Sequence, residues 1–509
     1  MDVWCKNTTY SIFKHTRKGE NDLPFLTLHA ARGGHVSGLI ALRDVEDFSL
    51  DAVEATVSRP EDIAVTVWLQ GYQRYNDERP YPDRPLAFAP CTVKANATQS
   101  LLLQFAVADA AAPGSVTADV TVRTGAGEQH VRIVIKIYDV LIPAAKDGAL
   151  DHEYFFSYDY GDAFGHPVPS FTPAWWDIYA TQLREMAAMR INVLHFALWP
   201  LLNGFVRKTG AADWSVDFSR LDEFIHFSLE HGAFRRLELG APLRSLTGET
   251  ITGFDEEGRE IALTAQTPEC EAYVRCVFGA LYGHFKEKGW LGMLLMHIAD
   301  EPHQTDNWLW MRGLMREVMP GVPCGEPLDQ YSSALELAED CDIFIPRFEV
   351  YEQGRDFFEQ RQAAGKTVWA YSCCYPEEPW YLNKFIDLPA AYARMVKWAL
   401  YAQGITGYLH WGLNFWNAAL YGLDPAARFK GDGFILYPDA GRQTFAPSNR
   451  AIASMEGVED YELLCLLAKR DPAAARALAR SVAATFRIYK EDPDVLELAR
   501  IRLLTLCEA

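Results

Sequence analysis

The sequence lacks any segment that is long and apolar enough to cross a membrane. No run of 18 apolar residues occurs among its 509 residues, so no transmembrane helix is predicted. The N-terminus, "MDVWCKNTTYSIFKHTRKGE", also lacks the apolar core of a secretory signal peptide. These two absences predict a cytoplasmic location and no membrane partner.

Positive charge is scarce as well. The 48 lysines and arginines are outnumbered by 68 acids, and the net charge of −20 disfavours nucleic acid and anionic lipid as partners. This charge suits an enzyme that acts on neutral or cationic small molecules. The ten cysteines form no C-x-x-C pair, and the adjacent Cys373 and Cys374 are poorly spaced for a structural disulfide. We therefore interpret all ten as reduced thiols.

Several familiar catalytic motifs are missing. The chain has no G-x-G-x-x-G and no G-x-S-x-G, "AAGKT" lacks the first glycine of a phosphate-binding loop, and "HEYFF" departs from H-E-x-x-H. Dinucleotide, nucleoside triphosphate, zinc-protease and serine-hydrolase functions therefore gain no support from motifs. The 13 histidines show no metal-ligand spacing, although His297 and His303 flank an acidic pair. We expect neither a metal nor a cofactor.

The N-terminal part, residues 1–142, has the pattern of an antiparallel β-sandwich. Apolar residues alternate with polar ones over 116–122 and again over 131–137, and Gly125 and Gly127 lie between the two runs. Two alternating runs joined by a glycine turn predict a hairpin. Several short strands with turn signals and no good helix are typical of a sandwich.

From residue 150 to about 438 the pattern changes to alternating strands and helices. A helix is expected from Pro173, with apolar residues at helical spacing, after a strand near 152–160. Close to eight such units follow, which fits a (β/α)8 TIM-like barrel, with a doubly wound sheet as the second choice. The Ala- and Leu-rich remainder, residues 439–509, is interpreted as a helical cap packed on the barrel.

The stretch "LLMHIADEPHQTDNW", residues 295–309, brings two adjacent acids, Asp300 and Glu301, to the end of a predicted barrel strand. That rim is where barrel enzymes build their active sites. Consecutive strand residues face opposite ways, so both acids can address one ligand only if the chain leaves the strand there, and Pro302 favours this. The alternative is structural, with the acids capping the next helix or pairing with a basic residue.

Other predicted strand ends add amide, aromatic, acidic and basic groups. Aromatic rings stack on the CH faces of sugars, and sugar hydroxyls need fixed polar partners, so this collection favours a sugar site. Each residue taken alone is more often structural, and it is the clustering that carries the hypothesis. The candidate substrate-binding residues are Asn192, His195, Glu326, Arg347, Tyr371, Trp411, Asn414 and Trp416.

The segment "MHIADEP" resembles the "HISDEP"-type motif of glycoside hydrolase family 123, the bacterial β-N-acetylgalactosaminidases. "GYLHWGLNFWN", "GDGFILYP" and "SMEGVEDYELL" are similar to C-terminal signatures of that family, and the similarity covers roughly residues 150–465. One departure is Ala299, where the family often has serine. The resemblance also fits the N-terminal sandwich.

The resemblance implies a retaining, substrate-assisted mechanism on a glycan that contains N-acetylhexosamine. Glu301 would be the general acid/base, and Asp300 would orient the 2-acetamido group of the sugar. The acetamido oxygen then serves as the nucleophile, so neighbouring acids can address neighbouring atoms of the substrate. The alternatives are a β-N-acetylglucosaminidase or another exo-glycosidase, and a non-catalytic carbohydrate-binding barrel. The oligomeric state is not predicted.

Overall fold

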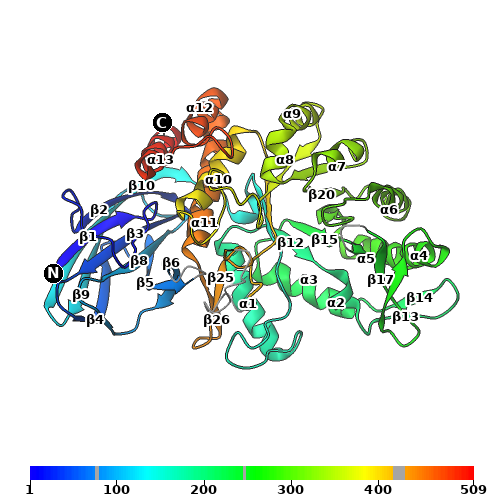
Figure 1. Ribbon diagram of the computed structural model, residues 1–509, viewed down its shortest axis with the longest axis horizontal. Coiled ribbons are helices and arrows are strands. Elements are labelled where there is room, and N and C mark those ends of the chain that lie inside the picture. The colour runs from blue at the N-terminus through cyan, green and yellow to red at the C-terminus, as the bar shows by residue number, and fades with distance from the viewer. Residues whose placement is uncertain (75–78, 245–247, 417–429, 509) are drawn as a thin grey trace.

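The computed structural model describes residues 1–74, 79–244, 248–416 and 430–508. Two β-sheets form the N-terminal end of the elongated molecule, and parallel strands with surrounding helices form the other end (Figure 1). Within the described residues, no helix combines the length and apolarity needed to span a membrane.

The N-terminal part consists of two five-stranded sheets. The first has the order β1-β3-β8-β5-β6: β1 (Asp2–Asn7), β3 (His35–Arg43), β8 (Thr98–Val107), β5 (Ile63–Arg74) and β6 (Pro80–Ala87). The second has the order β2-β10-β9-β4-β7: β2 (Phe25–Arg32), β10 (Gly127–Leu141), β9 (Gly114–Thr124), β4 (Phe48–Val57) and β7 (Cys91–Val93). The predicted hairpin is confirmed, because Val131 of β10 pairs with Val120 of β9 in antiparallel register. One pair, β2 with β10, is parallel, so this part is not antiparallel throughout.

The second part contains two parallel sheets. The larger has the order β19-β15-β12-β11-β24-β23: β19 (Leu294–Met296), β15 (Arg236–Leu239), β12 (Val193–Phe196), β11 (Asp151–Tyr154), β24 (Gly407–His410) and β23 (Ala370–Tyr371). The smaller consists of β20 (Gly325–Leu328), β21 (Ile343–Pro346) and β22 (Thr367–Val368). Single bridges, Met296 to Cys324 and Arg347 to Tyr371, lie between the two sheets. The strands lie where the sequence predicts them, but this pairing does not establish one closed eight-stranded barrel.

The expected helix at residue 173 is confirmed as α1 (Pro173–Ala188). The Thr172 side chain accepts from the Trp175 N–H and caps the helix, and Pro173 occupies its first turn, where no N–H is needed. The other helices of this part are α2 (Leu198–Leu202), α3 (Ser219–His231), α4 (Pro268–Tyr273), α5 (Gly279–Lys288), α6 (Thr305–Val318), α7 (Tyr331–Glu336), α8 (Phe348–Gln353), α9 (Arg355–Ala363) and α10 (Ala391–Ala402).

Short antiparallel strands that the sequence did not predict lie in the loops. They are β13 (Val206–Lys208) with β14 (Trp214–Val216), the three-stranded group β16 (Leu243–Arg244), β17 (Thr250–Phe254) and β18 (Glu260–Thr264), and β25 (Leu436–Asp439) with β26 (Thr444–Pro447).

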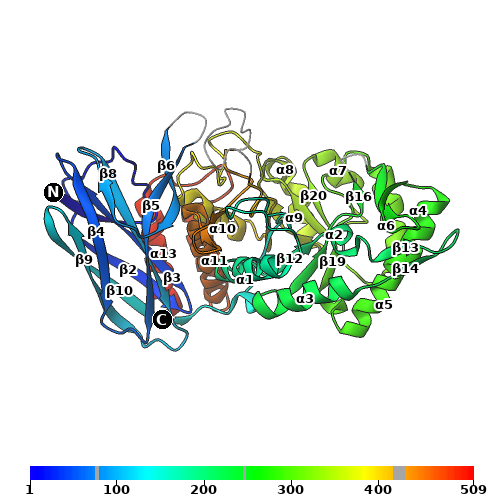
Figure 2. The ribbon, with the colours of Figure 1, turned by 90° about the horizontal axis from the view of Figure 1, so that it is seen from below.

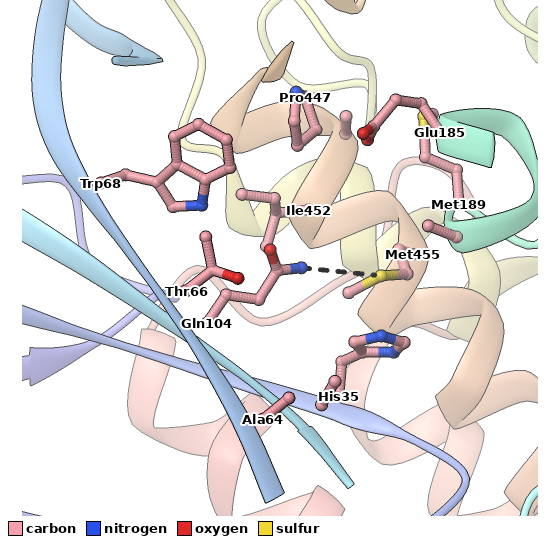
Figure 3. Close-up of a pocket in the computed structure, with 13 residues that line it drawn as sticks. His35, Ala64, Thr66, Trp68, Gln104, Glu185, Met189, Pro447, Ile452 and Met455 are labelled. Carbon is pink, nitrogen blue, oxygen red and sulfur yellow. Dashed lines mark hydrogen bonds between the residues drawn. The ribbon is translucent and has the colours of Figure 1, made fainter. Parts of the chain in front are cut away.

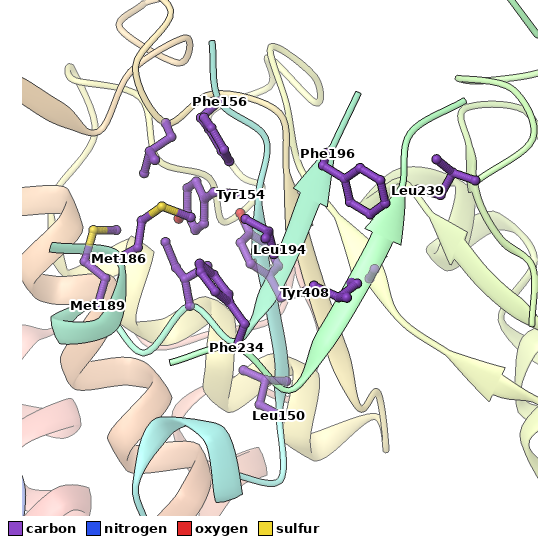
Figure 4. Packing of buried hydrophobic residues seen from close by; sticks show 14 of the residues in the cluster. Leu150, Tyr154, Phe156, Met186, Met189, Leu194, Phe196, Phe234, Leu239 and Tyr408 are labelled. Atoms are coloured by element: carbon purple, nitrogen blue, oxygen red, sulfur yellow. The ribbon is translucent and has the colours of Figure 1, made fainter. Parts of the chain in front are cut away.

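A large hydrophobic core joins the parallel strands to the helices that cover them. Figure 4 shows side chains of this core around β11, β12 and β15, among them Tyr154, Leu194 and Phe196, with Met186 of α1 on one side. A smaller cluster contains side chains from both parallel sheets, including Leu295 and Ile345.

The C-terminal helices α11 (Asn449–Ala468), α12 (Pro472–Val482) and α13 (Pro493–Glu508) reach further than a cap on the parallel strands. Figures 1 and 2 both place α11 between the N-terminal sheets and the parallel strands, and α13 packs against β2 and β10. The expectation that this segment packs on the barrel is corrected accordingly: it packs on both parts of the molecule.

Four buried acids on α11 hold its neighbours. Asp460 accepts from Arg394 of α10 at 2.7 Å and also pairs with Arg500 of α13. Glu459 accepts from the His35 ring of β3 at 2.8 Å. The other two are Glu456, which pairs with Arg394 at 3.0 Å, and Glu462, which accepts from the backbone N–H of Ala149 at 2.8 Å.

A cavity of about 210 Å³ lies where the N-terminal sheets meet α1 and α11. Figure 3 shows Trp68, Gln104 and Glu185 at its wall, together with Met455, whose sulfur lies 4.0 Å from the Gln104 amide. None of the predicted site residues lines this cavity.

Candidate active site

Asp300 and Glu301 lie in a turn that follows β19. Assigned pairing in β19 ends at Met296, and Ala299 makes one further parallel bridge to Leu243. Glu301 has φ of +52°, in the left-handed region that non-glycine residues rarely adopt. The chain therefore leaves the strand before the acids, as Pro302 suggested, and the alternation of strand side chains no longer fixes their directions.

The backbone that leads to the acids is held by Glu326 of β20. The two Glu326 carboxylate oxygens accept from the N–H groups of Ile298 and Ala299, each at 3.1 Å, and one also accepts from the Trp308 indole at 2.8 Å. Glu326 is fully buried. The predicted substrate-binding role of Glu326 is therefore corrected: its carboxylate positions the turn and does not face a ligand.

His297 completes this support. Its Nε2 lies 2.8 Å from the Ala299 carbonyl and 3.3 Å from a Glu326 oxygen. Burial alone would lower the pKa of His297, but the charge of Glu326 and the hydrogen bond to it raise that pKa to about 10. Burial raises the pKa of Glu326, and the charge of His297 and the hydrogen bond to it oppose that rise, so the two groups form one buried ion pair.

Glu301 lies half-buried among groups that control its proton. The Tyr371 hydroxyl, at the end of β23, donates to Glu301 Oε1, and Arg347 Nη1 lies 3.8 Å from the same oxygen. Burial raises the pKa of Glu301, the Tyr371 hydrogen bond and Arg347 lower it, and the charges of Asp300 and Asp329 raise it. The net effect is a raised pKa, which favours a protonated acid closer to neutral pH.

Asp300 is exposed, in contrast to its neighbour. Its charge acts on both Glu301 and His297, so it lies close to each. The site thus combines one half-buried acid whose pKa is raised with one exposed carboxylate. The environments of the two neighbouring acids thus differ in burial and in the charges that act on them.

Trp411 lies in the same region, after β24. Its ring is partly buried against the cluster that contains Tyr371 and Cys373. Its indole N–H donates to Asp432 at 2.6 Å, and burial raises the pKa of Asp432 to about 6. Sequence reasoning missed Asp432, although it lies in "GDGFILYP", one of the segments that carried the family resemblance.

His195 of β12 contacts protein groups through both its ring nitrogen and its ring face. Its Nδ1 is 2.9 Å from Glu238 of β15, and the ring lies on Phe155 with centroids 3.9 Å apart. Glu153, His195 and Glu238 could hold a metal ion, since one ligand atom of each lies within 4.8 Å of the others. Burial and the charge of Glu238 raise the pKa of Glu153 well above its ordinary value. The raised pKa favours the protonated form of Glu153 beside the carboxylate of Glu238.

Asn192 and Asn414 lie in the interior. The Asn192 side-chain amide precedes β12 and donates to the Leu150 carbonyl at 2.9 Å. The Asn414 side chain accepts from the Ser157 N–H at 2.7 Å and donates to Gln182 at 3.0 Å. Both residues are almost fully buried. Their predicted sugar-binding role is corrected, because each holds protein segments together instead.

Trp416 is likewise part of the protein core. Its indole N–H donates to the Leu436 carbonyl at 3.0 Å, and its ring stacks on Phe445 with centroids 5.8 Å apart. The last residue of the segment "GYLHWGLNFWN", Asn417, lies outside the described residues. The structure thus groups Asp300, Glu301, Arg347, Tyr371 and Trp411, and it gives Asn192, Glu326, Asn414 and Trp416 supporting positions.

A half-buried acid beside an exposed carboxylate, with tyrosine, arginine and tryptophan around them, is the arrangement of a glycosidase site. The family model "Glycoside hydrolase 123, catalytic domain" matches residues 162–467, and the chain belongs to this family. The family predicted from the sequence motifs is thereby confirmed.

A family 123 glycoside hydrolase from Clostridium perfringens, described for glycolipid glycan hydrolysis, has a similar fold. The similarity covers 99% of this chain and 97% of that one, with a TM-score of 0.78 at 14% identity. A β-D-glucuronidase of Dictyoglomus thermophilum is more distant, with a TM-score of 0.36 at 10% identity over 90% of this chain and 68% of that one. No curated protein matches the sequence significantly.

Proposed function

We propose that this glycoside hydrolase releases terminal β-linked N-acetylgalactosamine from glycans by a retaining, substrate-assisted mechanism. The observation that carries the proposal is the adjacent pair itself: Glu301 is half-buried with a raised pKa, and Asp300 beside it is exposed. The family supports hydrolysis of a glycoside. The choice of sugar rests on the sequence resemblance.

In this proposal Glu301 protonates the glycosidic oxygen. Its raised pKa keeps the proton on the acid to a higher pH than an ordinary glutamic acid would hold it. When the proton leaves, the Tyr371 hydroxyl and Arg347 stabilise the carboxylate that forms. Glu301 then acts as a base and takes a proton from the water that opens the intermediate.

Asp300 accepts a hydrogen bond from the acetamide N–H of the sugar. The acetamide oxygen attacks the anomeric carbon as the bond to the leaving group breaks, and positive charge develops on the acetamide group. The exposed carboxylate of Asp300 stabilises that charge. Water then attacks the anomeric carbon from the face that the leaving group vacated, so the released sugar keeps its β configuration.

We also propose that the nine parallel strands, with the consecutive β22 and β23 counted as one position, close into one (β/α)8 barrel over residues 150–438. Residues 1–142 would then be an N-terminal β-sandwich domain and residues 439–509 a C-terminal helical cap. The shared cluster of side chains from both sheets and the two bridges between the sheets support this closure. It would bring the ends of β19, β21, β23 and β24 to one rim. Glu301, Arg347, Tyr371 and Trp411 would then surround one sugar.

The test is a comparison of leaving groups in Glu301→Gln. We expect turnover of substrates with poor leaving groups to fall far more than turnover of activated aryl β-N-acetylgalactosaminides, because the latter need little protonation. Glu339→Gln is the matched control, since Glu339 is a surface acid with an 85% exposed side chain. An equal loss on both kinds of substrate would contradict the role of Glu301.

Mechanism and sugar are tested on the wild-type enzyme. Aryl β-GalNAc, β-GlcNAc and β-Gal glycosides are compared, and proton NMR identifies the first-formed anomer. We expect β-N-acetylgalactosamine as the first product and almost no turnover of the galactoside, which lacks the acetamide nucleophile. A first-formed α anomer or rapid galactoside hydrolysis would contradict substrate assistance.

A further inference from the structure

An exposed aromatic ring, that of Tyr375, lies against Arg347, the same arginine that approaches Glu301. Tyr375 is 41% exposed, although large aromatic side chains usually bury more of their surface. It follows β23 in a tight turn, in which the Cys373 N–H donates to the Tyr375 carbonyl at 3.0 Å. Asn383 anchors the turn by donating to the Cys373 carbonyl at 3.1 Å and to the Pro376 carbonyl at 3.2 Å. The Tyr375 ring is thus carried by a turn that hydrogen bonds hold in place.

Two short steps connect this ring to Glu301. The Arg347 guanidinium lies 5.2 Å from the centre of the Tyr375 ring, and the same Arg347 side chain reaches to 3.8 Å from Glu301 Oε1. The second connection runs along the chain: Tyr371 lies four residues before Tyr375, and the Tyr371 hydroxyl donates to Glu301. Tyr375 is therefore a neighbour of the acid, separated from it by one arginine.

We propose that Tyr375 forms the leaving-group subsite, where its ring stacks on the CH face of the sugar to which N-acetylgalactosamine is linked. This inference rests on the proposed function, because a general acid has to contact the oxygen that joins the two sugars. The leaving sugar must then lie on the Glu301 side of the site, where Tyr375 offers an exposed aromatic face. Arg347, which lies against the ring, keeps it in place.

The chemistry predicts a neutral pyranose as the preferred leaving group. An aromatic face binds the CH groups of a sugar without requiring charge. The charges of Asp300 and Asp329 act on Glu301, beside which the leaving sugar would lie, and they outnumber the single positive charge of Arg347, so a carboxylate or a sulfate on that sugar is disfavoured. A glycan in which N-acetylgalactosamine is linked to galactose or another neutral hexose fits both conditions.

The experiment compares two ligands that differ in the leaving-group position. The first is a β-N-acetylgalactosaminyl-galactose disaccharide, whose cleavage is followed by galactose release. The second is the thiazoline analogue of cyclised N-acetylgalactosamine, which has no leaving group and fills only the N-acetylgalactosamine position. The variants are Tyr375→Ala, Tyr375→Phe and Phe25→Ala, the last being a control because Phe25 is 45% exposed on β2 of the N-terminal sheets.

We expect Tyr375→Ala to lower kcat/KM for the disaccharide about tenfold, equivalent to about 1.4 kcal/mol. Its inhibition constant for the thiazoline should stay within twofold of wild type, and so should the pH at which activity falls on the alkaline side. Tyr375→Phe keeps the ring and should retain wild-type kcat/KM within about twofold. Phe25→Ala should change neither quantity.

Three results would overturn the inference alone. The first is an unchanged kcat/KM for the disaccharide in Tyr375→Ala. The second is an equal loss of thiazoline affinity, which would place the ring around the N-acetylgalactosamine position. The third is a shifted alkaline limb, which would mean that Tyr375 acts through Arg347 on Glu301. A wild-type enzyme that neither cleaves the disaccharide nor binds the thiazoline would instead overturn the proposed function.

Discussion

Removal of the Tyr371 hydroxyl tests how the site controls the proton of Glu301. In the wild type this hydroxyl donates to Glu301 and lowers its pKa, against the effect of burial. A hydrogen bond to a charged group contributes about 1.5–3 kcal/mol, or about 1–2 pH units in the pKa of its acceptor. Because the Glu301 side chain is 23% exposed, water replaces part of this bond, and the lower end applies. Tyr371→Phe should therefore raise the pKa of Glu301 by about one pH unit.

The assay is the pH dependence of kcat/KM with an aryl β-N-acetylgalactosaminide. Activity that depends on protonated Glu301 falls on the alkaline side, so this limb should move to higher pH in Tyr371→Phe. Tyr179→Phe is the control, since it removes a buried tyrosine hydroxyl that contacts Ser228 at 2.8 Å between α1 and α3. A limb that stays in place, or moves to lower pH, would refute the assignment of Glu301 as the titrating acid.

Four further predictions follow from the contacts of Asp300, Glu326, His297 and Asn414. Asp300→Asn removes a charge that raises the pKa of Glu301, so the alkaline limb should move to lower pH, and kcat should fall by about 100-fold as acetamide stabilisation is lost; an unchanged kcat would contradict this role. Glu326→Gln breaks a buried ion pair and should cost about 3–5 kcal/mol of unfolding free energy in urea denaturation, whereas the exposed Glu339→Gln should cost little. The pKa of His297 is raised from 6.5 to about 10, so the native state keeps a proton that the unfolded chain loses, and this contribution to stability should decline as pH rises between these values; Glu326→Gln should abolish that decline. Asn414→Ala should cost about 1–3 kcal/mol of unfolding free energy while KM stays unchanged, and a raised KM with unchanged stability would return Asn414 to the sugar site.

The sequence was most informative where the pattern is local. Alternation with a glycine turn predicted the β9–β10 hairpin, and Pro173 followed by apolar residues at helical spacing predicted α1. Both depend on neighbours along the chain. The parallel strands were located equally well, because apolar runs too short for a helix, between longer helical patterns, fit buried strands.

The sequence was least informative about what a polar side chain at a strand end contacts. Glu326 and Asn414 looked like ligand-binding residues, but their partners are backbone and side-chain groups of segments distant in sequence. No periodicity encodes those partners, since they depend on how separate elements pack. A buried backbone N–H needs a hydrogen-bond acceptor, and so does a sugar hydroxyl. The same carboxylate or amide side chain can accept from either, so its residue type does not distinguish the two roles.

The buried acids of α11 also determine how the molecule unfolds. Asp460 lies between Arg394 and Arg500, while Glu459 accepts from His35 of the N-terminal sheets, and all of these acids are shielded from water. Detaching the N-terminal sheets would remove His35 from Glu459 and leave it only Arg500 of α13, at 3.7 Å. It would also break the apolar cluster that Ile452 and Met455 of α11 form with the N-terminal sheets, which opposes separation. The two ends of the molecule should therefore melt together, as one calorimetric transition. The N-terminal sheets are therefore part of the folded unit of the hydrolase. The catalytic part produced without them would expose the acids of α11 to water.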